Sequence, residues 1–263
     1  MKSNKEKINL DIYFKLLNKP IFRMEDVNKY YDNISSARTS VYRLIQLGKV
    51  KKIRNNLYTC VVGENGGMNA NRFQIACAIN DTAYVSHHTA MEYYGITDQV
   101  FNDVYVSSKS KFEEFEFDGY RYHYVKPSID IGVKAIKYSG GISVTDKERT
   151  VLDCIKDLGK ISGLEEVIAN IEDIGKLNEK KLLNYLKEYG NQFLYQKTGF
   201  FLSMYNEQMK ISEAFFEECK KNIGKSKRYL TKNNGTNIYS SEWKIIVPKK
   251  LQMKNGGTAD AII

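Results

Sequence analysis

The sequence predicts an α+β fold arranged in two domains. Residues 1–62 alternate short helical and strand-like patterns, and a glycine-rich polar stretch at 63–71 interrupts both periodicities. Beyond it, mixed helical and strand patterns give way to almost continuous helical periodicity from Leu164 onward. We therefore expect an N-terminal domain over 1–62, a linker over 63–71 and a larger mixed α/β domain over 72–263 with a mainly helical C-terminal half.

The N-terminal domain is expected to begin with two helices. Apolar residues recur at helical spacing over 8–17, and Pro20 ends that helix soon afterwards. A short apolar piece at 21–22 follows, and a second helix is expected from about Glu25.

The third expected helix carries an exposed polar face. Ser35 or Ser36 can cap its N-terminus through a side-chain oxygen, and Gly48 is a natural C-terminal stop. At about 100° per residue, one face is apolar and contains Ala37, Val41, Leu44 and Ile45. The opposite face is short and hydrogen-bonding, with Ser40 and Tyr42 flanking Ser36, Thr39, Arg43 and Gln46.

A basic hairpin follows Gly48. Residues 49–54 and 57–61 are typical of two strands joined by Asn55-Asn56, because Asn tolerates the positive φ that a tight turn needs. Alternation is imperfect between Val50 and Ile53, which predicts a bulge or a strong twist. Helix, short strand, two helices and a hairpin is the order of a winged helix-turn-helix.

Positive charge is concentrated at the two ends of the chain. The formal net charge of +9 divides into +8 for residues 1–62, −4 for 63–200 and +5 for 201–263. Concentrated positive charge attracts phosphate through counterion release, so double-stranded DNA is the expected partner of the first segment.

The third helix is expected to enter a major groove about 12 Å wide, while the cations of the hairpin meet phosphates or an adjacent minor groove. An alternative is a winged helix that is used only for protein contact. The candidate DNA-binding residues are Ser36, Arg38, Thr39, Ser40, Tyr42, Arg43, Gln46, Lys49, Lys51, Lys52, Arg54 and Asn55.

The first half of the larger domain mixes helices and strands. A helix is expected in RFQIACAI, and AYVSHHTAMEYYGI is expected to be the end of a strand, a Ser86 cap, a short helix and a Gly95 stop. Strands are expected at 100–106 and 120–125. The acidic stretch between them is expected to be a solvated hairpin-like element, which could also imitate phosphate or meet a basic partner; it contains Glu113, Glu114, Glu116 and Asp118.

A capped helix over TDKERTVLDCIKDLG leads into the helical half. The pattern after Leu164 predicts successive helices separated by Gly, Asn or Ser, and a closing hairpin near the C-terminus contains Tyr239, Trp243, Ile245 and Val247. The tail NGGTADAII has no assigned role.

The sequence carries few signs of catalysis, and we expect neither an enzyme nor a cofactor or metal site. His87 and His88 are neighbours on a helix, where side chains diverge by about 100°, so packing or capping is expected of both. Phosphate-binding glycine loops are absent. One alternative is a metal-dependent nuclease that uses Glu242 and Lys244, although about four such acid-x-lysine triplets are expected by chance.

The expected location is the cytoplasm. No segment offers about 18 uninterrupted apolar residues, so no membrane partner is expected. Four cysteines lie far apart without a C-x-x-C pair, which favours reduced and mostly buried thiols: Cys60, Cys77, Cys154 and Cys219.

Three motifs in order resemble the AbiEi antitoxins of type IV toxin–antitoxin (abortive infection) systems. They are RNNLYT at the end of the hairpin, YVSHHTAMEYYGI and SVTDKERTVLDCI. The resemblance covers residues 20 to about 210. Asn56-Leu57 departs from it, because the family places a glycine directly before the tyrosine. The matching positions are Tyr58, Ser86, Thr89, Ala90, Gly95, Arg149, Thr150, Leu152 and Asp153.

The resemblance implies a repressor and antitoxin. Its winged helix would bind promoter repeats of its own operon, and its larger domain would neutralise a nucleotidyltransferase-like toxin, without a stable complex being assumed. Within the motifs we expect Arg149 and Asp153 to form an i, i+4 ion pair, and Ser86, Thr89 and Thr150 to cap or pack helices. A stand-alone transcription factor with a sensing domain is a further alternative.

Overall fold

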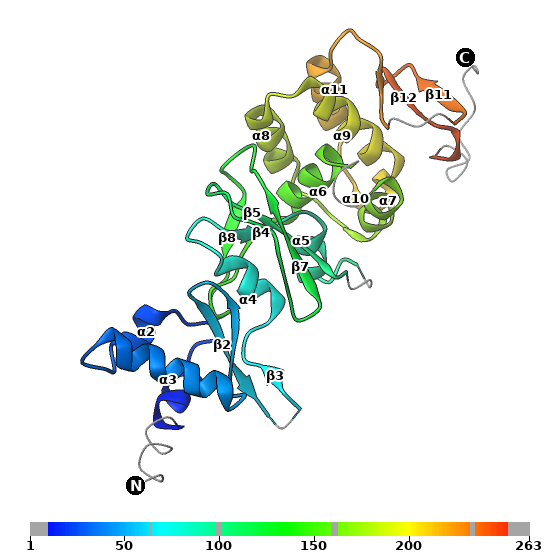
Figure 1. Ribbon diagram of the computed structural model, residues 1–263. Helices are drawn as coiled ribbons and strands as arrows, with labels where there is room; N and C mark the ends of the chain where they lie inside the picture. Colours follow the sequence, from blue (N-terminus) through cyan, green and yellow to red (C-terminus); the bar gives the residue numbers. More distant parts are fainter. Residues whose placement is uncertain (1–9, 64, 98–100, 159–162, 232–234, 252–263) are drawn as a thin grey trace. The chain divides into compact units, whose positions relative to one another are not determined.

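The computed structural model describes residues 10–63, 65–97, 101–158, 163–231 and 235–251 (Figure 1). Helices and several sheets make the chain a mixed α and β protein. It divides into two compact units, each built from separate stretches of chain. Unit 1 contains Met1–Val85, Asn102–Lys126 and Ala135–Val144, and unit 2 contains Ser86–Phe101, Pro127–Lys134 and Thr145–Ile263.

Unit 1 begins with a helix over 10–16, followed by α2 (Met24–Asn28) and α3 (Ile34–Gln46) (Figure 1). The apolar face of α3 packs into a core shared with the first helix and the hairpin, as its periodicity predicts. Buried members of this core are Leu16, Phe22, Val27, Ala37, Val41, Leu44 and Val50.

The predicted serine cap of α3 was wrong. Asn33 occupies the N-cap position, and its Oδ1 accepts a hydrogen bond from the backbone N–H of Ser36 at 2.8 Å. Asn in extended backbone caps a helix at least as well as serine, so the helix begins at Ile34 and both serines lie inside its first turn. The predicted stop is confirmed, since Gly48 adopts a φ of 67°.

The expected hairpin is present as β1 (Val50–Arg54) and β2 (Leu57–Val62), paired antiparallel. The register shifts between Lys52 and Arg54, which confirms the predicted irregularity. Asn56 takes the positive φ of the turn, at 54°, a conformation that Asn tolerates better than most residues.

The stretch expected to be a linker lies within unit 1. Its residues 67–68 form β3 (Gly67–Met68), which pairs with β2. The Asn69 amide donates hydrogen bonds to the carbonyls of Leu17 and Lys19, both at 2.9 Å. The composition of this stretch is typical of a flexible linker, but these hydrogen bonds attach it to the end of the first helix and the residues after it.

The rest of unit 1 is built on a mixed sheet. It contains α4 (Arg72–Cys77), β4 (Tyr84–Val85), β5 (Asp103–Ser107), β6 (Phe115–Phe117) and β7 (Tyr120–Val125). The strand order of this sheet is β6-β7-β5-β4-β9-β8, and its last two strands, β8 (Val133–Ala135) and β9 (Ser143–Thr145), include residues of both units. Strands β6 and β7 form the hairpin expected around the acidic stretch, paired antiparallel.

Unit 2 contains the predicted helical half. Its helices are α5 (His87–Tyr93), α6 (Lys147–Lys156), α7 (Leu164–Asp173), α8 (Glu179–Tyr189), α9 (Gln192–Met204), α10 (Asn206–Met209) and α11 (Glu213–Asn222). A three-stranded sheet follows, in the order β10 (Arg228–Tyr229), β12 (Ile245–Pro248), β11 (Asn237–Ser240), and the 3₁₀ helix η1 (Lys249–Leu251) is the last element within the described residues. The predicted closing hairpin is therefore β11–β12. The tail at 255–263 lies outside the described residues.

Helix α9 is the centre of unit 2, because residues on all its sides are buried. Trp243 is 1% exposed and packs directly against Gly199 in this helix. A Cβ atom at position 199 would lie 2.0 Å from the nearest atom of the Trp243 ring. The close approach of ring and helix therefore requires glycine.

None of the described helices combines the length and the apolar character that crossing a bilayer requires. The four cysteines are free thiols, and Cys60, Cys154 and Cys219 are buried while Cys77 is half-buried, which confirms that prediction.

Candidate functional site

Most of the candidate DNA-binding residues are exposed side chains of α3 and the β1–β2 hairpin in unit 1. Two are not exposed: Ser40 is buried, and Arg54 is half-buried. The other candidates are exposed, namely Ser36, Arg38, Thr39, Tyr42, Arg43 and Gln46 on α3, Lys49 after it, and Lys51, Lys52 and Asn55 on the hairpin.

Ser40 was expected to flank the polar face, and the structure corrects this placement. Its side chain is 4% exposed and accepts a hydrogen bond from the Tyr31 hydroxyl at 2.6 Å. Ser40 lies three residues after Ala37 and four before Leu44, so it belongs to the inner stripe of α3.

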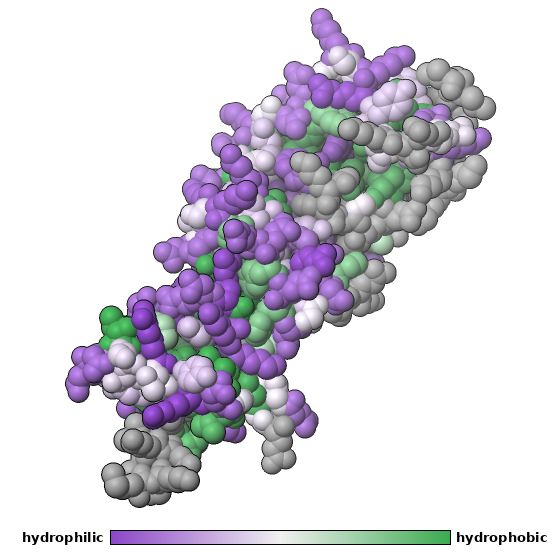
Figure 2. All heavy atoms as spheres, viewed as in Figure 1, coloured by the Kyte–Doolittle hydropathy of each residue, from purple (hydrophilic) through white to green (hydrophobic). Residues whose placement is uncertain are grey.

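A groove of about 640 Å³ separates α3 from the β1–β2 hairpin, and we call it the α3–hairpin groove. Arg38, Lys52 and Asn55 supply polar groups, and Ile34, Tyr42 and Tyr58 supply apolar surface. Figure 2 shows green patches among purple over the α2 and α3 part of unit 1. The remaining lining residues are Met24, Glu25, Asn28, Val41, Ile45 and Asn56.

Asn56 attaches the turn of the hairpin, on one side of the groove, to the start of α2. Its Oδ1 accepts a hydrogen bond from the backbone N–H of Met24 at 2.9 Å. Its Nδ2 donates to the Glu25 carboxylate at 3.0 and 3.2 Å. The turn of the hairpin is therefore tied to the start of α2, and the residues on either side of it face α3.

Asp26, which follows Glu25 in α2, is paired with neighbouring cations. Burial by itself raises the pKa of Asp26, but hydrogen bonds from Lys19 and the Arg23 backbone, with the charge of Lys29, hold that pKa below its ordinary value. Asp26 is thus a paired anion, and its charge does not oppose a phosphate nearby.

The cations of β1 are divided between two surfaces. Lys52 lines the α3–hairpin groove, whereas Lys51 Nζ lies 3.4 Å from the Asp118 carboxylate on the β6–β7 hairpin. The Arg54 guanidinium lies over the ring of Phe115, 4.9 Å from its centre. Successive strand residues point to opposite faces, so one face meets the groove and the other meets the acidic hairpin. Sequence reasoning treated all of these cations alike.

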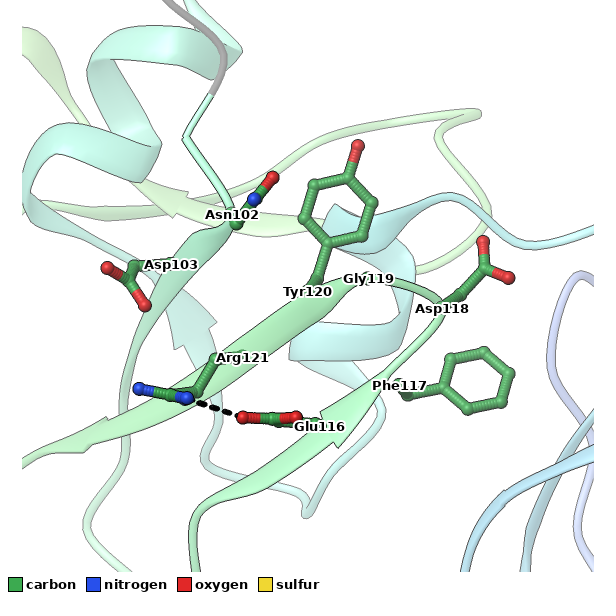
Figure 3. Close-up of a pocket in the computed structure, with 8 residues that line it drawn as sticks. All are labelled: Asn102, Asp103, Glu116, Phe117, Asp118, Gly119, Tyr120 and Arg121. Carbon is green, nitrogen blue, oxygen red and sulfur yellow. Dashed lines mark hydrogen bonds and ion pairs between the residues drawn. The ribbon is translucent and has the colours of Figure 1, made fainter.

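The acidic hairpin forms a shallow hollow of its own, of about 570 Å³ (Figure 3). Glu116 and Arg121 point to the same side and are 2.6 Å apart. His123 bridges Glu114 and Asp103, at 2.9 and 2.8 Å. Two of the expected acidic residues, Glu114 and Glu116, are therefore paired with side chains of β7 while they remain exposed to solvent, as expected. This pairing follows the alternation of FEEFEF against YRYHYV.

A second cluster of polar groups lies in unit 2. Ser86 Oγ is 2.8 Å from His87 Nδ1, and His87 Nε2 is 3.4 Å from Asp157 Oδ2. Burial raises the pKa of Asp157, but hydrogen bonds from His87 and Lys156 outweigh burial and hold that pKa well below its ordinary value. Ser86 and His87 are 0% and 2% exposed, so this serine, histidine and aspartate cannot meet a substrate from solvent in this conformation. Their role is to join α5 to the end of α6.

Lys197 in α9 completes that junction. Its ammonium donates to the carbonyls of Ile155 and Lys156 at 3.1 and 2.8 Å, which are among the last acceptors of α6. Burial lowers the pKa of Lys197 from 10.5 to about 8.

We expect the wild type to gain stability relative to Lys197→Met as pH rises from about 8 to 10.5. Over this range the native lysine is largely neutral while the unfolded one is charged, so the unfolded state binds more protons. The free energy of unfolding contributed by Lys197 then rises by roughly 1 kcal/mol per pH unit. Urea unfolding at several pH values, followed by fluorescence of the single tryptophan, checks this. A difference between the two proteins that is independent of pH would contradict the lowered pKa.

The residues of the nuclease alternative lie in the turn between β11 and β12. Glu242 accepts from Lys220 at 2.8 Å, and Lys244 Nζ is 3.5 Å from the Gly224 carbonyl. Across the described parts of the chain, no group of three His, Cys, Asp or Glu side chains is arranged to hold a metal ion.

The residues that carry the AbiEi resemblance are mostly interior. Arg149 Nε lies 2.9 Å from Asp153 Oδ2, with side chains 1% and 4% exposed, which confirms the predicted ion pair. Ser86 occupies the N-cap position of α5 but makes no capping bond. The other interior members are Thr89, Ala90, Thr150 and Leu152, and Gly95 ends α5 with a φ of 65°.

Comparison with known proteins gives a likeness of fold. No family model matches the chain, and a search of curated proteins finds no match. A solved structure, the RV2827C protein from Mycobacterium tuberculosis, is similar with a TM-score of 0.63 and 10% sequence identity. The match covers 90% of this chain and 89% of that one, so the two share their fold over most of their length.

Proposed function

We propose that the protein is a sequence-specific repressor that binds double-stranded DNA. In this proposal the helix over 10–16, α2, α3 and the β1–β2 hairpin act as a winged helix-turn-helix. Helix α3 would enter the major groove, and the hairpin would lie along the adjacent backbone.

One observation carries this proposal. Arg38 and Arg43 on α3 and Lys52 on β1 are exposed, and within the described parts of the chain they have no ion-pair partner. Lys51, by contrast, already has an ion-pair partner in Asp118. A surface of unpaired cations beside a helix with a hydrogen-bonding face fits the phosphates and base edges of a duplex.

We expect Arg43→Ala and Lys52→Ala to weaken DNA binding in different ways. Arg43→Ala should weaken binding to a duplex selected from a random library about 10- to 100-fold and alter the base preference, because an arginine that contacts a base edge is worth roughly 1 to 3 kcal/mol. Lys52→Ala should weaken all duplexes alike and lower the salt slope by about 1, because it removes one phosphate contact. Fluorescence anisotropy over a range of salt concentrations measures both.

Two matched controls sharpen the test. Lys180→Ala removes an exposed lysine of α8 and should leave binding unchanged. Lys51→Ala removes a lysine already paired with Asp118, so its effect should be smaller than that of Lys52→Ala. Equal losses on selected and random DNA for Arg43→Ala would contradict base contact, and no duplex binding at low salt would end the proposal.

We further propose, on the AbiEi resemblance, that the protein is also an antitoxin for a nucleotidyltransferase-like toxin. The support is the order of the three motifs and the packing of two of them as α5 and α6 in unit 2. Co-expression with a nucleotidyltransferase-like protein from the adjacent reading frame tests this. An Arg43→Ala, Lys52→Ala variant should still restore growth while it fails to repress a promoter reporter. If no such frame adjoins the gene, a stand-alone regulator is favoured instead.

A further inference from the structure

The exposed face of α3 includes two large apolar residues that phosphate binding does not explain. Ile34, Arg38 and Tyr42 are spaced four residues apart, so they lie in one row along the helix, and all three line the α3–hairpin groove. Ile34 is 55% exposed and Tyr42 is 62% exposed, whereas the neighbouring Ala37 and Val41 are buried. We call these three residues the 34–38–42 row.

We propose that the 34–38–42 row contacts thymine methyl groups in the major groove, an inference that rests on the proposed DNA binding and deepens it. Thymine is the one ordinary base that presents an apolar group there, since the other edges are hydrogen-bond donors or acceptors. Ile34, or the ring of Tyr42, placed against those polar edges would remove water without replacing its hydrogen bonds. Against a methyl group, the same side chains bury apolar surface on both partners.

The length of the row fixes the spacing of the thymines. From Ile34 to Tyr42 the helix rises by about 12 Å, at roughly 1.5 Å per residue. Base pairs are about 3.4 Å apart along a duplex axis, so the two contacted methyl groups lie about three or four base-pair steps apart. Arg38, midway along the row, can then donate to a guanine edge or a phosphate between them.

Charge favours DNA over a second copy of the chain as the occupant of this surface. A two-fold dimer would bring the row and groove against their own counterparts, which places Arg38 and Lys52 of one copy near those of the other. Neither cation has an ion-pair partner within the described ranges, and the groove lining holds one acid, Glu25, against these two cations, so that arrangement would be repulsive on balance. A duplex supplies negative charge to both cations and methyl groups to Ile34 and Tyr42.

The test removes only the methyl groups. A duplex enriched by the full-length protein from a library of about 20 random base pairs is synthesised with thymine and again with deoxyuridine at every thymine position. The wild type should bind the uracil form roughly tenfold more weakly, as expected for two lost methyl contacts. Single replacements should trace the loss to two positions three or four steps apart.

Matched variants assign the effect to the row. Ile34→Ser combined with Tyr42→Ser should bind the thymine and uracil forms with equal affinity. Both side chains are exposed, so the fold does not depend on them. Leu47→Ser removes another apolar residue, 57% exposed and outside the groove lining, and should keep the full preference for thymine.

The outcomes distinguish a failure of the thymine contact from a failure of the proposed DNA binding. Equal affinity of the wild type for both forms of an enriched duplex overturns the thymine contact and leaves sequence-specific binding intact. A dimer that the double serine variant abolishes, with no effect of uracil, assigns the row to a second copy and also overturns the inference. If no duplex is enriched at all, the proposed function itself fails.

Discussion

Arg149→Met is expected to destabilise unit 2 by about 3 to 5 kcal/mol, because it leaves the Asp153 carboxylate buried without its cation. Arg149 is 1% exposed, and its guanidinium also donates to the Ile131 carbonyl at 2.5 Å and lies over the Tyr189 ring. Tyr189 shares the site, since burial and the charge of Asp153 raise the pKa of its hydroxyl. Urea unfolding followed by fluorescence of Trp243, the single tryptophan and itself in unit 2, measures the loss.

The double variant Arg149→Met, Asp153→Leu is the control for this prediction. It removes both charges, so no uncompensated carboxylate remains and much of the lost stability should return. A cost below about 1 kcal/mol for Arg149→Met alone would mean that water or another cation replaces the guanidinium, and would contradict the structural role of this pair.

Gly199→Ala is expected to destabilise unit 2 by about 1 to 3 kcal/mol, or more if the ring cannot shift. In an exposed helix interior the same change stabilises by roughly 1 kcal/mol, because alanine favours the helix over glycine. The sign is reversed here since the new Cβ would lie 2.0 Å from the Trp243 ring, which is packed in the core. Thermal unfolding followed by circular dichroism measures the change.

The same substitution in a protein without the Trp243 ring tests whether contact with the ring causes the loss of stability. In a Trp243→Leu protein the ring is absent, so Gly199→Ala should become neutral or stabilising. If alanine at position 199 destabilises both backgrounds equally, contact with the indole is not the cause. The comparison uses circular dichroism because the variant has lost its only tryptophan.

The sequence predicts most local elements of this fold because their signals are short-range. Gly48 ends α3, Asn55-Asn56 turns the hairpin, and the spacing of Arg149 and Asp153 places them on one helical face. The exposed cations of α3 follow in the same way from helical periodicity. Each of these predictions depends on residues within a few positions of one another.

The parts that the sequence does not predict depend on contacts between distant residues. Ring stacking on Phe115 takes Arg54 away from solvent, and Asp118 pairs with Lys51, but nothing near residue 54 in the sequence signals the β6–β7 hairpin. The same holds for Asn69, whose amide bonds make an expected linker part of unit 1. The cap of α3 is different, since Asn33 was present in the local pattern and competes successfully with two serines.

Unit 1 is built from separate segments of the chain, and this limits how it can be transferred from one gene to another. Fragments ending at Val62 would lack the aromatic support of Arg54, the acid that holds Lys51 and the Ala78 carbonyl that accepts from Arg23 at 2.6 Å. Gene fusion transfers one continuous segment of coding sequence, whereas unit 1 is built from three separate segments of the chain. A protein that carries only the first sixty or so residues of this chain is therefore expected to be less stable in that part than the intact unit.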